Sequence, residues 1–558
     1  MDKKTLALSA LVGFIVGVFW MSDWQWSLEA AEVVAGTISL PTANPMVIFA
    51  KHLYAPFLIW PQVALLKLGV SSENISILFS GIQSGLSFMS VTAFLLVISK
   101  DRIVSLVTPI ILTYLPDTLF IGHSYSVFFP TNLNNGGLLA FSAVIMAIAS
   151  LGAGYMQLFL LILGILPALH PGMAMGVWFG AIVYYVVSDK TNRLQMRNNV
   201  RWFVYGVVFF FITVLIHRLL SGSFIEQATV VEKRIVDYFI SFVDGHRSPK
   251  LSPLSWKDRL GYFEPEIMLF VGLPLLFGRY KQFMSKGTQN MLKLLGAMSV
   301  SGVVMTLLWE MYSNSFPSIL KTVMFARWLN FDSILLPLFF IGAICMRHSW
   351  RKISALSILF FFGMYGSIVW WWMFAFLIVC FEIEMHAPNV VKAIYDRASI
   401  TVFQVVALCF CLFIIGKFIQ GGTMPLMRYS PKKIALLSKI SQGEGLFISS
   451  HQILALPQVM THRGLAFNLY WMDTMTYVPT VAGEMEDILN NVYGFSIFDK
   501  GIWPSLDVIR LQWEKRSLAQ WQDIKARYDV TDVLSPNSWN LKLPKVIESE
   551  TLVLYHIP

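Results

Sequence analysis

The feature that most constrains the fold is a succession of long apolar runs that continues from the N-terminus to about residue 420. The runs Thr5 to Met21, Ile75 to Ser99 and Phe203 to Leu220 each approach the roughly 20 residues that a helix needs to cross a bilayer. Hydrophobic residues make up 56% of the chain and charged residues 13%, which excludes a soluble fold for most of its length. Because backbone polar groups in hydrocarbon must be paired inside helices, we predict a polytopic α-helical membrane protein with roughly 11 to 13 transmembrane helices.

Basic residues gather in short loops between the apolar runs, as at Lys100 and Arg102 and from Lys190 to Arg201. The positive-inside rule assigns such loops to the cytoplasm. The net charge of +9 therefore reflects membrane topology, and no nucleic-acid partner is expected. We predict a membrane domain of residues 1–420, whose longer outward-facing segments are residues 22–74, 122–136, 221–266 and 312–332.

The long apolar runs end near Gly421, and residues 435–558 are predicted to form a small soluble α/β domain. Hydrophobic patterns predict strands at Gly445–Ser450, Leu465–Tyr470, Val530–Leu534 and Thr551–Ile557, and helices at Met485–Val492 and Leu506–Arg527. The side of the membrane depends on whether the run Ile353–Cys380 is one span or is divided at Gly363–Gly366. If Ile353–Cys380 is one span, the chain crosses the membrane twelve times and the soluble domain is cytoplasmic. If the run is two spans, there are thirteen crossings and the domain faces outward, which is the arrangement that we predict.

The segment after the first apolar run carries Asp23, Glu29 and Glu32, followed by a turn that contains Asn44. Ionisable groups at the edge of hydrocarbon are costly unless paired or hydrated, which makes this segment a candidate site. A single acidic residue in an aqueous loop is as often only solvated. Helical spacing places Glu29 and Glu32 on one face, where mutual repulsion raises one pKa and makes that carboxylate a better base.

Three further outward positions carry cationic side chains. Asp244, His246 and Arg247 form a short loop able to hold a phosphate or sugar, or a loop that is only salt-bridged. Lys321 and Arg327, shortly before Asn330, indicate an anionic partner such as a lipid-linked phosphate, or side chains that extend to lipid head groups. His170 lies in the turn Leu169–Gly172, which divides the run Met156–Val187 into two spans, and it fits either a phosphate ligand or a structural role.

The motifs of the common soluble enzymes do not occur. The sequence has no phosphate-binding glycine loop, no Gly-x-Ser-x-Gly elbow, no His-Glu-x-x-His and no Cys-x-x-Cys. Its four cysteines lie in apolar runs and are expected to be packing residues, so no metal site is predicted. There is also no evident chain of carboxylates in the spans that would indicate a transporter, with Asp117 as the main exception.

A first span, an acidic outer loop, many further spans and a terminal soluble domain together resemble the GT-C class of integral-membrane glycosyltransferases. Four stretches are also similar to patterns in a group of largely uncharacterised bacterial membrane proteins: Gly36–Pro45, Asp244–Arg247, Arg327–Asn330, and Tyr477–Pro479 with Val492–Gly494. The resemblance runs along most of the chain. It implies a multi-pass protein of the bacterial inner membrane whose terminal domain is periplasmic.

The resemblance implies that a sugar passes from a polyprenyl-phosphate donor to a glycan, lipid or protein acceptor on the outward face. A carboxylate of the first loop would act as the base. The loop lacks the adjacent acidic pair that many GT-C enzymes show, so the assignment is ranked Glu32, then Glu29, then Asp23. No cofactor is implied, and a requirement for a divalent cation is left open.

The remaining roles follow from the same resemblance. The donor phosphate would be held by Arg327, His246, Arg247, Lys321 and His170, supported by Asn44, Asp244 and Asn330. The acceptor would be held by Trp471 and Arg463, with His462 and Asp473 also available. The alternative function is a non-enzymatic polyprenyl-lipid-binding or transport protein of envelope polysaccharide assembly, with membrane lipids as partners.

Overall fold

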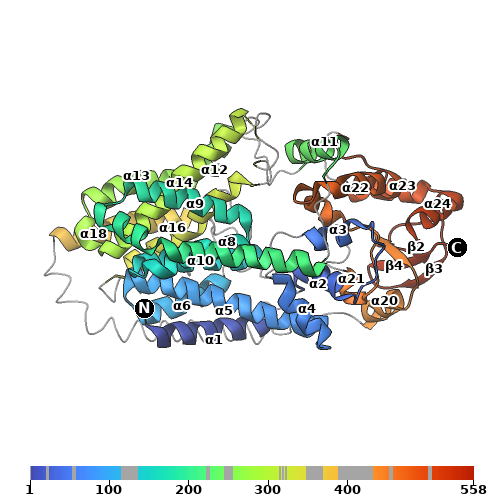
Figure 1. The fold of residues 1–558 in the computed structure, drawn as a ribbon, viewed down its shortest axis with the longest axis horizontal. Helices are drawn as coiled ribbons and strands as arrows, with labels where there is room; N and C mark the ends of the chain where they lie inside the picture. Colours follow the sequence, from blue (N-terminus) through green and yellow to red (C-terminus); the bar gives the residue numbers. More distant parts are fainter. Residues whose placement is uncertain are drawn as a thin grey trace.

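The computed structural model describes residues 2–19, 24–52, 58–114, 136–221, 227–243, 255–312, 316, 320, 323–346, 368–386, 431–450, 457–499 and 505–558. These residues form a bundle of apolar helices and a smaller C-terminal α/β domain, which lie at opposite ends of the long axis of the molecule (Figure 1). The chain is thus mostly helical, with one small sheet near its C-terminus.

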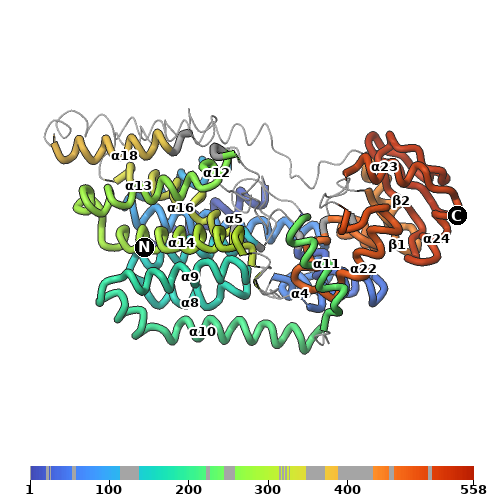
Figure 2. The backbone as a smooth tube through the Cα atoms, turned by 90° about the horizontal axis from the view of Figure 1, so that it is seen from above, coloured from blue at the N-terminus to red at the C-terminus, as the bar shows by residue number. Residues whose placement is uncertain are grey.

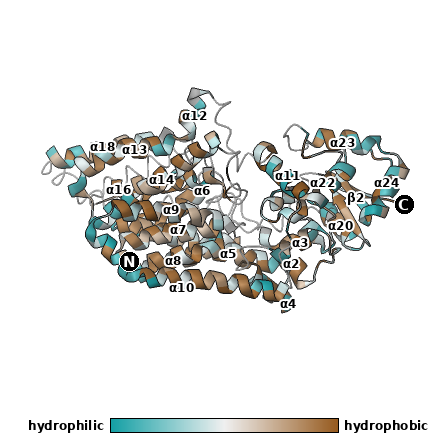
Figure 3. Ribbon diagram, turned by 45° about the horizontal axis from the view of Figure 1, so that its top comes forward, coloured by the Kyte–Doolittle hydropathy of each residue, from teal (hydrophilic) through white to brown (hydrophobic). Residues whose placement is uncertain are grey.

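The bundle helices lie roughly along this long axis, with α10 at one edge and α18 at the opposite edge (Figure 2). Hydrophobic residues predominate on them (Figure 3). In the described part of the chain, four helical segments are long and apolar enough to cross a membrane, and four apolar helices are shorter. The bundle helices are α1 (Lys3–Phe19), α5 (Ser72–Ser99), α6 (Arg102–Tyr114), α7 (Gly136–Gly152), α8 (Met156–Leu169), α9 (Pro171–Val187), α10 (Lys190–Ser221), α13 (Glu264–Gly278), α14 (Lys286–Tyr312), α16 (Asn330–Ile344) and α18 (Ile368–His386).

The predicted division of the run Met156–Val187 is confirmed. Helix α8 ends at Leu169 and α9 begins at Pro171, with His170 between them in extended conformation. The physical reason is that proline at the first helical position lacks the N–H that an uninterrupted helix would need. By contrast, the division expected at Gly363–Gly366 lies outside the described residues.

Small residues allow α1 and α5 to pack at very short distance. Gly13 and Gly17 of α1 face Ser80 and Ser84 of α5, and a methyl group at Gly17 would lie 2.4 Å from the carbonyl oxygen of Ser80. Spacing of small residues by four positions is the usual pattern of close helix pairs in membranes. This contact fixes the C-terminal end of α1, from which the acidic segment continues, against the first half of α5.

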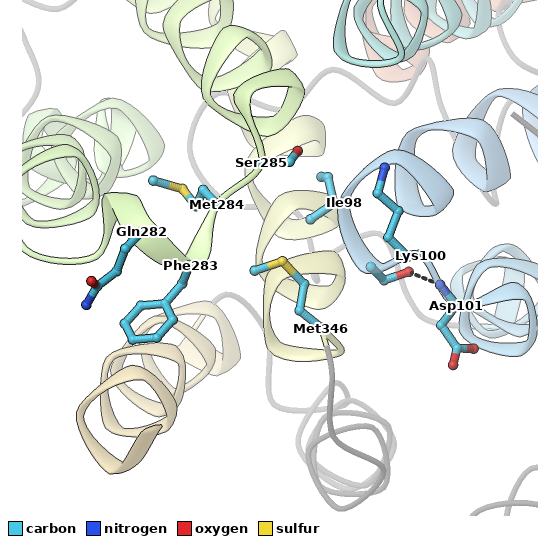
Figure 4. Close-up of a pocket in the computed structure, with 9 residues that line it drawn as sticks. Ile98, Lys100, Asp101, Gln282, Phe283, Met284, Ser285 and Met346 are labelled. Carbon is cyan, nitrogen blue, oxygen red and sulfur yellow. Dashed lines mark hydrogen bonds between the residues drawn. The ribbon is translucent and has the colours of Figure 1, made fainter. Parts of the chain in front are cut away.

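The basic loops gather at the end of the bundle where the chain begins. Arg102 forms an ion pair with Asp2 at 2.8 Å, and Lys286 lies 3.8 Å from Asp189. A cavity of about 490 Å³ separates the Lys100–Asp101 connection from the turn η4 (Lys281–Phe283), as Figure 4 shows. The C-terminal domain lies at the other end of the bundle (Figure 1).

Short helices lie at the end of the bundle that faces the C-terminal domain. They are α2 (Trp26–Ala35), α3 (Pro45–His52), α4 (Ile59–Lys67), α11 (Val230–Tyr238), the π-helix η3 (Phe239–Val243) and α12 (Trp256–Tyr262). Neither α3 nor α4 is long enough to cross a bilayer. Trp60 of α4 donates a hydrogen bond to Nδ1 of His217 on α10 at 3.1 Å, which anchors this layer to the bundle.

The C-terminal domain contains one four-stranded sheet with the order β1-β2-β4-β3. Strand β1 pairs in parallel with β2, and β4 pairs antiparallel with both β2 and β3. Its strands are β1 (Leu446–Ser449), β2 (Val530–Pro536), β3 (Lys545–Glu548) and β4 (Leu552–His556). Its helices are α20 (Pro431–Ser441), α21 (Pro457–Thr461), η9 (Leu469–Thr476), η10 (Pro479–Val481), α22 (Ala482–Ile488), η11 (Leu489–Tyr493), α23 (Leu506–Lys515) and α24 (Leu518–Tyr528).

Three expectations for this domain are corrected. The segment Leu465–Tyr470 is not a strand, because only Leu465 bridges to β1 and the chain then turns into the 3₁₀ helix η9. The helix expected at Leu506–Arg527 is two helices, because Ser517 caps a new helix with Gln520 in a capping box. Strand β3 was not expected, because its four residues are too few to show a clear alternation of apolar and polar side chains.

Candidate functional site

The acidic helix α2 lies between the bundle and the C-terminal domain (Figure 1). Gln25, just before α2, contacts the N-terminal half of α5: its backbone N–H donates to Ser76 and its side chain to Ser80. At its other end α2 stops at Gly36, whose φ of 80° is a left-handed conformation that glycine adopts without strain. With both ends held, α2 presents one fixed face to the C-terminal domain.

Glu29 is buried at the interface between α2 and the C-terminal domain. Its side chain is 1% exposed, and it accepts a hydrogen bond of 2.7 Å from the indole Nε1 of Trp471 in the C-terminal domain. Burial raises the pKa of Glu29 to about 8, while the contacts with Trp471 and Gln458 oppose the shift. A carboxyl group of α2 therefore pairs directly with the C-terminal domain.

Glu32 lies one helical turn further and is also fully buried. Ser72, at the start of α5, donates a hydrogen bond to its Oε1, and Nδ1 of His462 lies 3.6 Å from the same atom. Burial raises the pKa of Glu32 to about 8, the hydrogen bond from Ser72 lowers it, and repulsion from Glu29 raises it further. The expected repulsion between the two carboxylates is thus present, although desolvation has the larger effect.

His462 connects this buried pair with the exterior. Its side chain is 49% exposed, and its backbone adopts a left-handed φ of 53°, which is uncommon for a residue other than glycine. Burial of part of the ring lowers the pKa of His462 below its usual value, so the imidazole is neutral at pH 7. A neutral imidazole beside a carboxyl group can accept or return a proton.

Asn44 joins the turn after α2 to the C-terminal domain. Its side-chain amide donates to the carbonyl oxygen of Ala466 at 3.0 Å, and its Oδ1 accepts from the backbone N–H of Met46 at 2.9 Å. Gly464 packs so closely against Ser39 that a methyl group there would lie 2.8 Å from the Ser39 carbonyl oxygen. Asn44 therefore holds the turn after α2 to the C-terminal domain.

The structure gives internal contacts to the two residues expected to bind an acceptor. Trp471 is buried, and its N–H is directed to Glu29. Arg463 is buried as well, where it pairs with Asp532 and donates to the carbonyl oxygens of Ile440 and Gly445. Both side chains stabilise the domain and its interface in this conformation, and a role in acceptor binding remains a prediction.

A second group of predicted residues meets inside the bundle. The indole of Trp328, in the 3₁₀ helix η6 (Phe325–Leu329), donates to the carbonyl oxygen of Gly172 at 3.0 Å, so the turn at His170 lies against the segment that carries Arg327. His170 caps α9 by accepting from the N–H of Met173 at 3.3 Å. Arg327 is 9% exposed, which argues against a side chain extended to lipid head groups.

Asn330 follows at the start of α16 and is completely buried. Within the ranges that the structure describes, neither its amide nitrogen nor its amide oxygen has a hydrogen-bond partner. Buried amides are normally paired, so this side chain is an unusual feature of a packed interior. It is consistent with the supporting role predicted for Asn330 but does not test it.

The sequence analysis missed a pair of buried carboxyl groups. Glu266 of α13 and Asp332 of α16 are both buried inside the bundle, where Ser299 of α14 donates to Oδ2 of Asp332 at 2.6 Å. The expectation that the spans carry no evident series of carboxylates, apart from Asp117, therefore needs this correction. The sequence signal was weak, with Glu264 and Glu266 in the first turn of α13 and Asp332 in the first turn of α16.

Several predicted residues cannot be assigned a place. Asp23, Asp244, His246, Arg247 and Lys321 lie outside the described residues, as does Asp117. Among the residues that are described, no group of three or more His, Cys, Asp or Glu side chains is placed to hold a metal ion.

Comparisons with known proteins complete this description. No protein-family model matches the chain, and no curated protein matches it in sequence. One solved structure to which it is similar is the archaeal oligosaccharyltransferase AglB from Archaeoglobus fulgidus, in complex with an inhibitory peptide and a dolichol-phosphate. The match covers 96% of this chain and 69% of that chain, with 10% sequence identity and a TM-score of 0.36. At these values the similarity by itself decides neither the fold nor the activity of this protein.

Proposed function

We propose that this protein is a membrane glycosyltransferase. It would transfer a sugar from a polyprenyl-phosphate donor to an acceptor on the outward face of its membrane. The observation that carries the proposal is the pair Glu29 and Glu32, buried between the bundle and the C-terminal domain. Two carboxyl groups held at the membrane edge with raised pKa values fit general-base chemistry better than structural packing.

The proposed reaction is a displacement at the anomeric carbon of the donor sugar. An acceptor hydroxyl oxygen forms the new bond to this carbon, and the bond from the carbon to the phosphate oxygen breaks. Polyprenyl phosphate leaves with the bonding electron pair, and the hydroxyl proton passes to a carboxylate of the protein. The two needs of this reaction are a base for the hydroxyl and positive charge for the departing phosphate.

Glu32 is the better candidate for the base. A pKa near 8 makes its carboxylate a stronger proton acceptor than an ordinary glutamate, whose pKa is 4.5. Glu29 is closed off by Trp471, whereas Glu32 adjoins the half-exposed ring of His462. The proton taken up by Glu32 would then leave to water beside the half-exposed ring of His462.

Positive charge for the leaving phosphate would come from Arg327. It lies in the turn segment between α14 and α16, against the α8–α9 turn that contains His170. The basic loops at the opposite end of the bundle give a consistent orientation, since the positive-inside rule would place them in the cytoplasm and the C-terminal domain outside. A bacterial inner membrane is part of the same proposal.

The test uses purified protein in nanodiscs, labelled polyprenyl-phosphate sugars and a panel of glycan, lipid and peptide acceptors. Removing the base in Glu32→Gln should lower the transfer rate by about two to four orders of magnitude. Arg327→Ala should lower it by about two to three orders of magnitude. The matched control is Glu73→Gln, which makes the same change at an exposed glutamate in the first turn of α5.

Wild-type rates in both Glu32→Gln and Arg327→Ala would refute the site assignment. If the wild-type protein binds the polyprenyl-phosphate sugar but transfers it to no acceptor, the lipid-binding or transport alternative replaces the enzyme. A fusion of alkaline phosphatase after Pro558 tests the orientation separately, because this reporter is active only outside the cytoplasm.

A further inference from the structure

A second polar cavity lies in the C-terminal domain. It has a volume of about 480 Å³ and is formed where η11, α23 and α24 meet. Figure 1 shows α23 and α24 on the part of the domain that points away from the bundle, whereas α2 lies on the bundle side. The cavity is therefore separate from the site formed by Glu29 and Glu32.

The base of this cavity is the buried cation Arg516. Its side chain is 9% exposed, and one terminal nitrogen donates to the backbone carbonyl of Asn491 at 2.6 Å. The guanidinium lies over the ring of Trp521, 4.9 Å from its centroid, which fixes its plane. The other terminal nitrogen, Nη1, is buried and has no hydrogen-bond partner in the part of the chain that the structure describes.

Arg516 also lacks an ion-pair partner among the described residues. Burial lowers its pKa to about 10, and the only group that opposes this shift is the phenol of Tyr493. A buried arginine without a carboxylate is costly, because the charge loses water without gaining an opposite charge. By contrast, Arg527 on the same cavity wall is neutralised by Asp487. The cavity wall also carries the carboxylate of Asp523, so the two cations Lys515 and Arg516 leave one net positive charge there.

The rim of the cavity is rich in amide side chains. Gln512 lies one turn before Arg516 on α23 and is held in place by Gly494, whose missing Cβ leaves room for it. Gln520 uses its carbonyl oxygen to cap α24, accepting from Ser517 at 2.8 Å, so its NH₂ group is the part that can serve a ligand. Amide groups can donate to and accept from hydroxyl groups, and arginine binds a carboxylate or phosphate through paired N–H groups.

We propose that this cavity is a binding site for an anionic carbohydrate, in which Lys515 and the guanidinium of Arg516 hold a carboxylate or phosphate on the sugar and the amides hold its hydroxyls. A sugar carboxylate and a sugar phosphate have the same chemistry in common, namely an anionic oxygen group on a polyhydroxylated ring. Its biological role rests on the proposed function: the cavity would hold a distal unit of an acidic acceptor polymer while another unit occupies the transferase site.

Binding is measured on the full-length protein in nanodiscs by isothermal titration with four probes: glucuronate, glucose 6-phosphate, glucose and inorganic phosphate. Glucuronate, glucose 6-phosphate or both should bind at least about tenfold more tightly than glucose, a difference of about 1.4 kcal/mol. The two charged sugars separate a carboxylate site from a phosphate site. Inorganic phosphate binding as tightly as the charged sugars would show an anion site without carbohydrate recognition and would overturn the proposal.

The decisive variant is Gln512→Glu. It keeps the side-chain shape but adds a carboxylate one turn before Arg516, where it can form an ion pair and compete with the ligand. Affinity for the charged sugar should fall at least about tenfold, since a charge-assisted hydrogen bond is lost. The matched control, Gln522→Glu, adds the same charge at an exposed position of α24 outside the cavity and should bind as the wild type does.

Unchanged binding by Gln512→Glu, or equal loss in Gln522→Glu, would refute the cavity as the site. Transfer to acidic and neutral acceptors is then compared in the same variants. If charged sugars bind but the wild-type protein transfers to no acceptor, the proposed function fails while the binding site stands. If transfer occurs and no charged sugar binds, the binding site fails while the proposed function stands.

Discussion

Replacing Glu29 by glutamine should remove much of the sensitivity of the fold to alkaline pH. The folded protein raises the pKa of this carboxyl group from 4.5 to about 8, because Glu29 is desolvated. The protonated form is thus favoured by folding. Its stabilising contribution is fully present below about pH 4.5, declines as the pH rises through this window, and is lost above about pH 8.

The expected size follows from the width of this window. Each pH unit well inside this window lowers the free energy of unfolding by about 1.4 kcal/mol, and the slope is half as large at pH 8, so wild-type protein should lose about 2 kcal/mol through Glu29 between about pH 6 and pH 8. Glu29→Gln cannot ionise and still offers a carbonyl oxygen to the indole of Trp471. The variant should therefore be relatively more stable as the pH rises.

Denaturant unfolding in nanodiscs, followed by tryptophan fluorescence at a series of pH values, measures this difference. Glu73→Gln, at an exposed glutamate, should keep the wild-type pH dependence. Glu32→Gln should flatten the curve in the same direction as Glu29→Gln, because its pKa is raised to about 8 as well. An identical pH dependence in Glu29→Gln and wild type would refute the conclusion that folding holds this carboxyl group protonated.

Three further outcomes are expected. The transfer rate should rise with pH towards about 8, because Glu32 acts as a base only when ionised, and a rate that falls over this range would exclude Glu32 as the base. Asn44→Ala should lower the free energy of unfolding by about 1 to 2 kcal/mol and increase proteolysis between the bundle and the C-terminal domain, since it loses bonds to Ala466 and Met46; unchanged proteolysis would contradict this. Gly17→Val should prevent close packing of α1 on α5 and reduce the yield of folded protein, whereas Leu11→Val at an exposed position should not, as size-exclusion profiles will show.

Local patterns in the sequence predicted the elements that depend on nearby residues. The break between α8 and α9 follows from Pro171, and β1, β2 and β4 follow from short hydrophobic runs. Leu465–Tyr470 has a similar pattern but pairs through a single bridge, because Phe447 of β1 meets Leu465 alone before η9 begins. Strand pairing depends on distant partners, which a local pattern does not contain.

In the candidate site as well, features that depend on nearby residues were predicted and contacts between distant residues were not. The spacing of Glu29 and Glu32 predicted two carboxyl groups on one face of a helix, and both are buried together at the interface. Their partners Trp471 and His462 could not be paired with them, because no periodicity links residues more than 400 positions apart. Glu266 and Asp332 were missed for the same reason, since they lie in the first turns of two separate apolar helices that only the packed bundle brings together.

The bond between Trp471 and Glu29 joins residues 442 positions apart, and this separation has a consequence for synthesis. Ribosomes add about 5 to 20 residues per second, so Glu29 is made about 20 to 90 s before the residue that covers it. During that interval α2 and its two carboxyl groups can meet water, and they ionise as ordinary glutamates do. Completion of the C-terminal domain then buries them and raises their pKa values. Folding of that domain therefore decides when the two carboxyl groups lose contact with water.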